Sequence, residues 1–262
     1  MMSKKVFAIL LSFCLFTGLI CLIGMSRELL VYKNADSLYE AMAEEIEAAA
    51  EAAVTAGETD ADGAIKKEEV KGQTISYENL DFEELRKKYP DIIGWIRSED
   101  GVLNYPVVQR NDNVYYLDHL PDGKENAVGS VFLDCNNKND FIESVSVVYG
   151  HHVKNGMMFG YLDNYRKQEF YEENPYLYLY TEEKNYKIEL AAAYLMDGTS
   201  GAYPLYFDNE YQMKSYLEKA GENSFFYAQY EVKHDDRLII LSTCAYDFDN
   251  ARLAVAGLLK EY

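Results

Sequence analysis

Cys244 and Arg252 stand at the two ends of a short acidic segment, and each of them borders an apolar run. The run Leu238–Thr243 ends at the cysteine, and the run Leu253–Leu259 follows the arginine. A free thiol is only a few per cent thiolate at neutral pH, so a nucleophilic cysteine needs a partner that supplies positive charge or takes its proton. An arginine never loses its charge and stabilises the oxyanion of an acyl transfer. If the two runs are neighbouring strands, Arg252 returns to the sheet end that carries Cys244.

A histidine at the end of another strand is the predicted proton-transfer partner. His151 and His152 follow the apolar run Val145–Tyr149. An imidazole at the rim of a small barrel would form a nucleophile–base pair with Cys244. On the residues alone, other interpretations stay open: polar loop histidines, an inert buried thiol, and an Arg252 that pairs with Asp247 or Asp249. The histidines form no metal-binding spacing pattern, so we predict neither a metal site nor a cofactor.

Short strands are the elements that would position these residues. Several runs alternate with period two, and one helix interrupts the late strands. Eight such strands with one inserted helix favour a mainly β fold, a closed eight-stranded β-barrel. The predicted strands are Gly94–Arg97, Leu103–Val108, Gly129–Leu133, Val145–Tyr149, Tyr176–Thr181, Tyr186–Leu195, Arg237–Thr243 and Leu253–Leu259, with helices at Asp81–Tyr89 and Asp208–Ala220.

The N-terminal quarter has the composition of a membrane anchor followed by a spacer. Val6–Met25 carries no charge and follows two lysines, which predicts a single-pass membrane helix with residues 1–5 cytoplasmic and the catalytic domain extracellular. A cleaved signal peptide is the alternative. Residues 26–74 are expected to form a helical stalk, rich in Ala and Glu, and a polar linker. The folded domain is expected to span residues 75–262.

Charge and cysteine content restrict the function classes. The formal net charge is −19 and no basic stripe occurs, so nucleic acid is not an expected partner. Two of the four cysteines lie within Val6–Met25, which leaves only Cys135 and Cys244 for the folded domain. Two thiols do not make a disulfide scaffold, although one bridge between them stays open.

Three ordered blocks resemble the sortase family, and together they cover about two thirds of the chain. The run Ile240–Cys244, followed by Arg252, is similar to the family's T-L-x-T-C…R signature, with Ile240 in place of its threonine. The other blocks are Val148–His152 with Met158-Phe159, and Asn104–Gln109 with Tyr115–Leu117. The YGHH and LSTC forms and the helix inserted before the cysteine strand look most like class B. Cys135 stands where we expect a larger or polar residue.

The resemblance implies a cysteine transpeptidase with Cys244 as nucleophile, His151 as general acid/base and Arg252 as oxyanion or carbonyl stabiliser. It implies that the enzyme cleaves an N-P-x-T-N/G-like sorting motif of secreted proteins. The acyl chain would then pass to an amine of a peptidoglycan precursor or cross-bridge. Ser242, Thr243, Tyr206 and Tyr211 are the expected substrate contacts, although the tyrosines are as readily structural. Three alternatives stay open: a pilin-polymerising sortase, a cysteine peptidase acting mainly as a hydrolase, and a non-catalytic scaffold.

Overall fold

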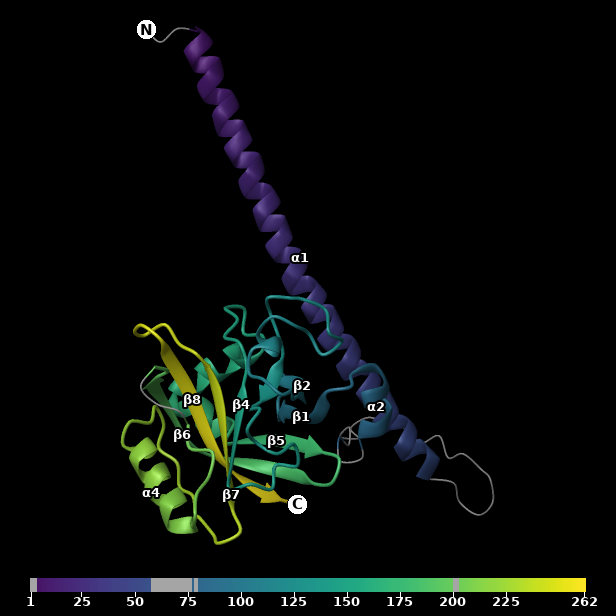
Figure 1. Cartoon of the computed structure of the whole chain (residues 1–262), viewed down its shortest axis with the longest axis vertical. Helices are drawn as coiled ribbons and strands as arrows, with labels where there is room; N and C mark the ends of the chain where they lie inside the picture. Colours follow the sequence, from purple (N-terminus) through teal and green to yellow (C-terminus); the bar gives the residue numbers. More distant parts are fainter. Residues whose placement is uncertain (1–3, 58–76, 78–79, 200–202) are drawn as a thin grey trace. The chain divides into compact units, whose positions relative to one another are not determined.

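A closed barrel of eight strands forms the folded part of the chain. The computed structural model describes residues 4–57, 77, 80–199 and 203–262. The strand order around the barrel is β1-β2-β3-β4-β7-β8-β6-β5, which confirms the predicted eight-stranded barrel (Figure 1). The strands are β1 (Ile92–Ser98), β2 (Asn104–Val108), β3 (Val131–Leu133), β4 (Val145–Tyr149), β5 (Tyr176–Thr181), β6 (Asn185–Asp197), β7 (Arg237–Cys244) and β8 (Ala251–Glu261).

Two of the strand pairs are parallel, and one of them brings distant segments together. β4 pairs with β7 in parallel, with Val145 opposite Leu238 and Tyr149 opposite Ser242. β2 and β3 form the other parallel pair. A parallel pair needs a long crossover, and here the chain between β4 and β7 makes β5, β6 and a helix before it returns. The ends of β4 and β7 therefore meet at the same rim.

Short helices fill the crossovers. α2 (Phe82–Lys88) begins where the Asp81 side chain accepts a hydrogen bond from the amide of Glu84, at 2.9 Å, and its basic last turn suits the helix dipole. α4 (Glu210–Gly221) is the predicted helix between β6 and β7, and it lies against β6 (Figure 1). Sequence patterns did not predict η2 (Tyr115–Leu117), η3 (Phe159–Arg166) or α3 (Gln168–Glu173). These segments are too short to show a helical period.

The face of the barrel wall beneath α4 forms one continuous apolar cluster. Met213 and Leu217 of α4 belong to one buried cluster with residues of four strands: Val145 and Val147 of β4, Ala192 and Tyr194 of β6, Leu238 and Ile240 of β7, and Ala254, Ala256 and Leu258 of β8. Alternation along a strand assigns the next residues of the same parity to this face. The next residues of that parity are Tyr149 of β4, Ser242 and Cys244 of β7, and Arg252 of β8.

Helix α1 (Lys4–Gly57) is longer than the predicted stalk. The chain divides into one compact unit up to Ala41 and a second from Met42 onward. In the second unit, Met42 and Ile46 of α1 are buried. The predicted linker falls mostly on residues outside the described ranges, and the predicted domain boundaries stay predictions.

The membrane anchor predicted at Val6–Met25 is contradicted. In the part of the chain that the structure describes, no helix has an apolar stretch long enough to cross a bilayer. A spanning helix needs roughly 20 consecutive, predominantly apolar residues. The single-pass topology and the extracellular location that were drawn from the anchor are therefore corrected as well.

Candidate active site

The nucleophile candidate and the arginine candidate lie opposite each other on neighbouring strands. In the antiparallel pair β7–β8, Cys244 is the register partner of Arg252. Directly opposite residues of such a pair have their side chains on the same face and within contact range. The loop between them is closed by the amide of Ala245, which donates to the carbonyl of Ala251 at 2.9 Å. The predicted return of Arg252 to the rim is what the structure shows.

The parallel pair β4–β7 brings His151 to the same rim. Tyr149 pairs with Ser242, and the amide of Gly150 donates to the Ser242 carbonyl at 3.1 Å. His151 follows Tyr149 by two residues, as Cys244 follows Ser242. The pairing therefore brings His151 to the rim that carries Cys244. Residues two apart share a face, so this rim continues the wall beneath α4.

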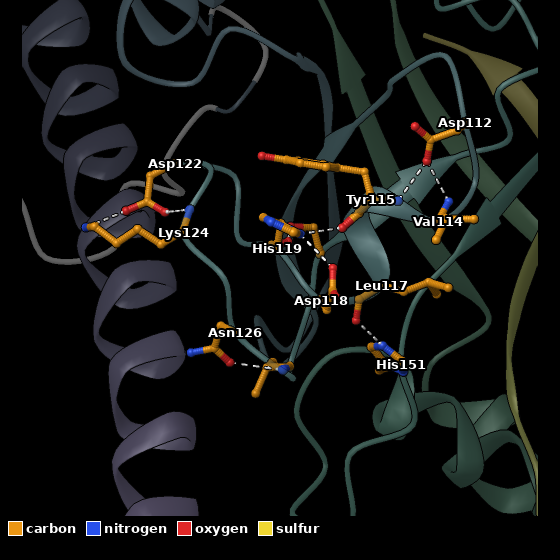
Figure 2. A network of polar contacts seen from close by, with 12 residues as sticks. Asp112, Val114, Tyr115, Leu117, Asp118, His119, Asp122, Lys124, Asn126 and His151 are labelled. Atoms are coloured by element: carbon orange, nitrogen blue, oxygen red, sulfur yellow. Dashed lines mark hydrogen bonds and ion pairs between the residues drawn. The ribbon is translucent and has the colours of Figure 1, made fainter.

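A carbonyl on η2 holds the imidazole of His151. The Nε2 atom of His151 lies 2.6 Å from the carbonyl oxygen of Leu117, and Figure 2 shows the ring directed at that carbonyl. A carbonyl oxygen only accepts hydrogen bonds, so Nε2 carries the hydrogen of this pair. The other nitrogen, Nδ1, is then the atom that exchanges a proton with a reacting group.

The η2 segment is itself tightly fixed. The carboxylate of Asp112 accepts hydrogen bonds from the amides of Val114 (2.8 Å) and Tyr115 (2.7 Å), and these bonds lower the pKa of Asp112 (Figure 2). Gly129 packs on the other side of the segment with φ +62°. A Cβ atom at that position would lie 2.7 Å from the Leu117 carbonyl and 3.0 Å from Cδ2 of His151. Only glycine fits this contact.

A pocket of about 570 Å³ opens beside the thiol. Its walls are Cys244, Arg252 and the loop between them, residues 245–250. Cys244 is partly exposed. The alternative of an Arg252–Asp247 ion pair is not formed, because Asp247 binds Arg166 instead, with two bonds of 2.8 and 3.0 Å. The guanidinium of Arg252 thus faces the thiol's pocket without that counter-ion.

The predicted substrate contacts lie at different places. Ser242 is on the face of Cys244, buried beneath Tyr203, whose hydroxyl donates to the Ser242 hydroxyl at 2.8 Å. Thr243 is also buried, and strand alternation directs its side chain to the opposite face. Tyr206 and Tyr211 are 67% and 77% exposed. Tyr203 is the tyrosine of this insert that reaches the strand of the thiol.

The second thiol of the barrel is not bonded to the first. Cys135 and Cys244 are both free cysteines, so the bridge that the sequence left open is absent. Cys135 follows β3, and its amide donates to the side chain of Asn113 at 2.8 Å. Burial and the nearby Asp134 raise the pKa of the Cys135 thiol, which disfavours the reactive thiolate there.

Sequence reasoning did not identify Leu117, Gly129 or Arg166 as parts of the site. Leu117 acts through its backbone carbonyl, which leaves no trace in residue type. Gly129 was predicted as the first residue of a strand, whereas β3 begins at Val131, and an isolated glycine is compatible with many roles. Arg166 carries no local signal, since its partner lies on another loop.

Comparisons with known proteins agree with this geometry. No protein-family profile matches the chain. Sortase B of Listeria monocytogenes is 31% identical over 68% of this chain and 74% of its own length. The Staphylococcus aureus sortase B–substrate complex is 29% identical with a TM-score of 0.64, over 69% of this chain and 84% of that one. A sortase B solved with triglycine is 25% identical with a TM-score of 0.68, over 86% of this chain and 99% of that one. The chain therefore belongs to the sortase family, class B, and is a cysteine transpeptidase.

Proposed function

We propose that this transpeptidase uses Cys244, His151 and Arg252 to cleave an N-P-x-T-N/G-like sorting motif and to transfer the acyl chain to an amine of the cell wall. The observation that carries the assignment is the strand register. The pair Cys244–Arg252 on β7–β8 and the pair Tyr149–Ser242 on β4–β7 support it, because they bring the ends of these strands to one rim. Cys244 and Arg252 also line one pocket there.

The first half of the reaction forms a thioester. The Sγ atom of Cys244, as thiolate, attacks the carbonyl carbon at the scissile bond, and the guanidinium of Arg252 stabilises the resulting oxyanion. When the oxyanion collapses, the C–N bond breaks. His151 gives the proton on Nδ1 to the leaving amine. The hydrogen bond from Nε2 to the Leu117 carbonyl keeps the ring oriented throughout.

The second half transfers the acyl chain. An incoming amine attacks the thioester carbon, loses a proton to His151, and releases the thiolate of Cys244. The similar sortase B structure with triglycine supports a small amine acceptor. The complex of the Staphylococcus aureus sortase B with its substrate supports a substrate site in this fold. The proposed donors are proteins with a C-terminal sorting motif, and the proposed acceptors are amines of peptidoglycan precursors or cross-bridges.

Mass spectrometry of the full chain with N-P-x-T-N and L-P-x-T-G peptides tests the assignment. We expect an acyl adduct on Cys244 from the N-P-x-T-N peptide, which is discharged as an amide when triglycine is added. Cys244→Ala should form no adduct. Cys135→Ala is the matched control, because it removes the other thiol of the barrel, and it should form the adduct as wild type does.

Three outcomes would change the proposal. An adduct on Cys135 instead of Cys244 would overturn the nucleophile. Release of free acid at a rate that triglycine does not alter would make the enzyme a hydrolase. Discharge by a lysine peptide but not by triglycine would point to pilin polymerisation.

A further inference from the structure

The loop between the thiol and the arginine carries two acids. Asp247 and Asp249 line the same pocket as Cys244 and Arg252. A carboxylate that pairs with Arg252 would compete with the reaction's oxyanion for the same guanidinium. An unpaired carboxylate on this loop would therefore inhibit the proposed reaction by binding the guanidinium of Arg252.

Arg166 at the end of η3 engages one of these acids. Its Nη1 and Nη2 atoms bind the two oxygens of Asp247 at 3.0 and 2.8 Å, which is a bidentate pair. This pair lowers the pKa of Asp247, so the carboxylate is charged at neutral pH. Without Arg166, a full negative charge would stand on the loop beside Arg252.

Arg166 is itself fixed in place by two further groups, Asp163 and Phe225. Its Nε atom donates to Asp163 at 3.0 Å, and its guanidinium lies over the ring of Phe225 at 5.0 Å from the centroid. Asp163 also accepts from Nε2 of His152 at 2.5 Å. The His152 side chain is 10% exposed, so this end of the network is anchored within the protein. Arg166 is thus held in the fork geometry that Asp247 requires.

Arg252 is left for the reaction. Among the described residues, no carboxylate lies within ion-pair distance of its guanidinium, and Nη1 makes a long hydrogen bond of 3.3 Å to the carbonyl of Ala251. Gly198 packs on its stem, where a Cβ atom would lie 3.2 Å from Cγ. The arginine is positioned by backbone and packing, and its charge is not neutralised.

We propose that Arg166 is a positioning residue that sequesters Asp247 and so keeps the guanidinium of Arg252 free for the oxyanion. This inference rests on the proposed role of Arg252. Arg166 touches neither the thiol nor the reacting atoms. It acts through Asp247, and the effect of its loss should therefore depend on the charge of that one residue.

Kinetics of Arg166→Met with a sorting-motif peptide test the proposal. We expect kcat to fall about fivefold, the upper range for a partly exposed ion pair, with KM little changed. Adding Asp247→Asn to Arg166→Met should restore kcat, because the competing charge is gone. Adding Asp249→Asn, the same chemical change two residues further on, should not. Arg166→Lys should lie between wild type and Arg166→Met, since it keeps the charge and loses the fork.

A structural role for Arg166 predicts the opposite interaction. If Arg166 only holds the loop, the double variant Arg166→Met/Asp247→Asn should be as slow as Arg166→Met or slower. Equal rescue by Asp249→Asn would show a general effect of loop charge. Either result overturns the proposal. Arg86→Met is the matched control for loss of a partly buried, ion-paired arginine, since Arg86 of α2 pairs with Glu182, which lies between β5 and β6.

A readout that needs no catalysis separates this inference from the proposed function. In ¹⁵N-labelled full chain, the Nε–Hε signal of Arg252 is assigned by its loss in Arg252→Lys. We expect this signal to shift in Arg166→Met and to return in the double variant with Asp247→Asn. An Arg252 signal that does not move in Arg166→Met overturns the sequestration, whatever the peptide assay gives. If Cys244→Ala and Arg252→Lys both keep wild-type activity, the proposed catalytic mechanism is rejected instead.

Discussion

At the residue scale, the hydroxyl of Ser242 shows how the site is covered. Ser242 is 2% exposed, and Tyr203 donates a hydrogen bond to it from the segment between β6 and α4. Burial raises the pKa of Tyr203 to about 12, so the phenol stays protonated and remains a donor over the whole physiological range. A neutral, partly buried hydrogen bond therefore joins the strand that carries the nucleophile to the segment before α4.

Tyr203→Phe should lower the free energy of unfolding by about 1 kcal/mol, because the buried Ser242 hydroxyl loses its donor. The difference from wild type should shrink as pH rises from about 10 to 12. Over that window the unfolded Tyr203 phenol ionises while the folded one is still protonated, so the wild type loses more stability there than the variant, which lacks this group. Urea unfolding followed by the fluorescence of Trp95 measures both. Tyr206→Phe, at an exposed ring, is the control, and an equal effect of the two variants would contradict the account.

At the element scale, η2 and the glycine that packs on it set the orientation of His151. Asp112 fixes the start of the segment, and the Leu117 carbonyl ends it against the imidazole. Gly129 allows the close approach, since a Cβ atom there would lie 2.6 Å from the Tyr116 carbonyl. A general base works only within hydrogen-bond reach, so a shift of this segment moves the base away from the thiol.

Gly129→Ala should lower the free energy of unfolding by about 1–3 kcal/mol and reduce kcat, because the new methyl group displaces Leu117 and His151. Gly156→Ala is the matched control. Gly156 also has positive φ, at +87°, but a Cβ atom there would meet nothing within 4 Å. It shares the backbone strain without the clash, so it should lower stability less and leave the pH profile of kcat unchanged. If both variants reduce kcat equally, the clash with the histidine support is not the cause.

At the scale of the whole molecule, the barrel is closed through the long pair of β6 and β8. The pair runs from Tyr186 opposite Glu261 to Asp197 opposite Ala251, with an irregularity between Leu190 and Ala192. Gly257 lies opposite Leu190 at this point. A Cβ atom on Gly257 would come within 2.6 Å of Ile188 and 3.0 Å of the Glu189 carbonyl, so the closure depends on a residue without a side chain there.

Gly257→Ala should therefore destabilise the protein by about 1–3 kcal/mol through overpacking. Gly221→Ala, at the end of α4, meets nothing within 4 Å and should change stability by less than about 1 kcal/mol. Thermal and urea unfolding distinguish the two variants. Folded Gly257→Ala should keep wild-type kcat at 25 °C, since the rim lies at the other end of β8. A Gly257→Ala protein as stable as wild type would show that the β6–β8 pair opens without cost.

The sequence by itself determined the local elements of this protein. The alternation in Tyr176–Thr181 and Val145–Tyr149 predicted β5 and β4 to the residue, and the acidic start of Phe82–Lys88 predicted α2. These signals are local, since the spacing of apolar residues within one strand or helix reveals its period. The order of the three blocks also identified the family, and Cys244, His151 and Arg252 were named from it.

The tertiary structure decided what those residues contact. The parallel pairing of β4 with β7, the Leu117 carbonyl on His151 and the Arg166–Asp247 pair join segments that are far apart in the chain. From the sequence, Asp247 was a candidate ion-pair partner of its near neighbour Arg252. In the structure, its carboxylate pairs with Arg166 instead. Composition also predicted a membrane span, and the structure corrects that prediction. These contacts depend on which surfaces of the chain pack against each other, and a local sequence pattern does not contain that information.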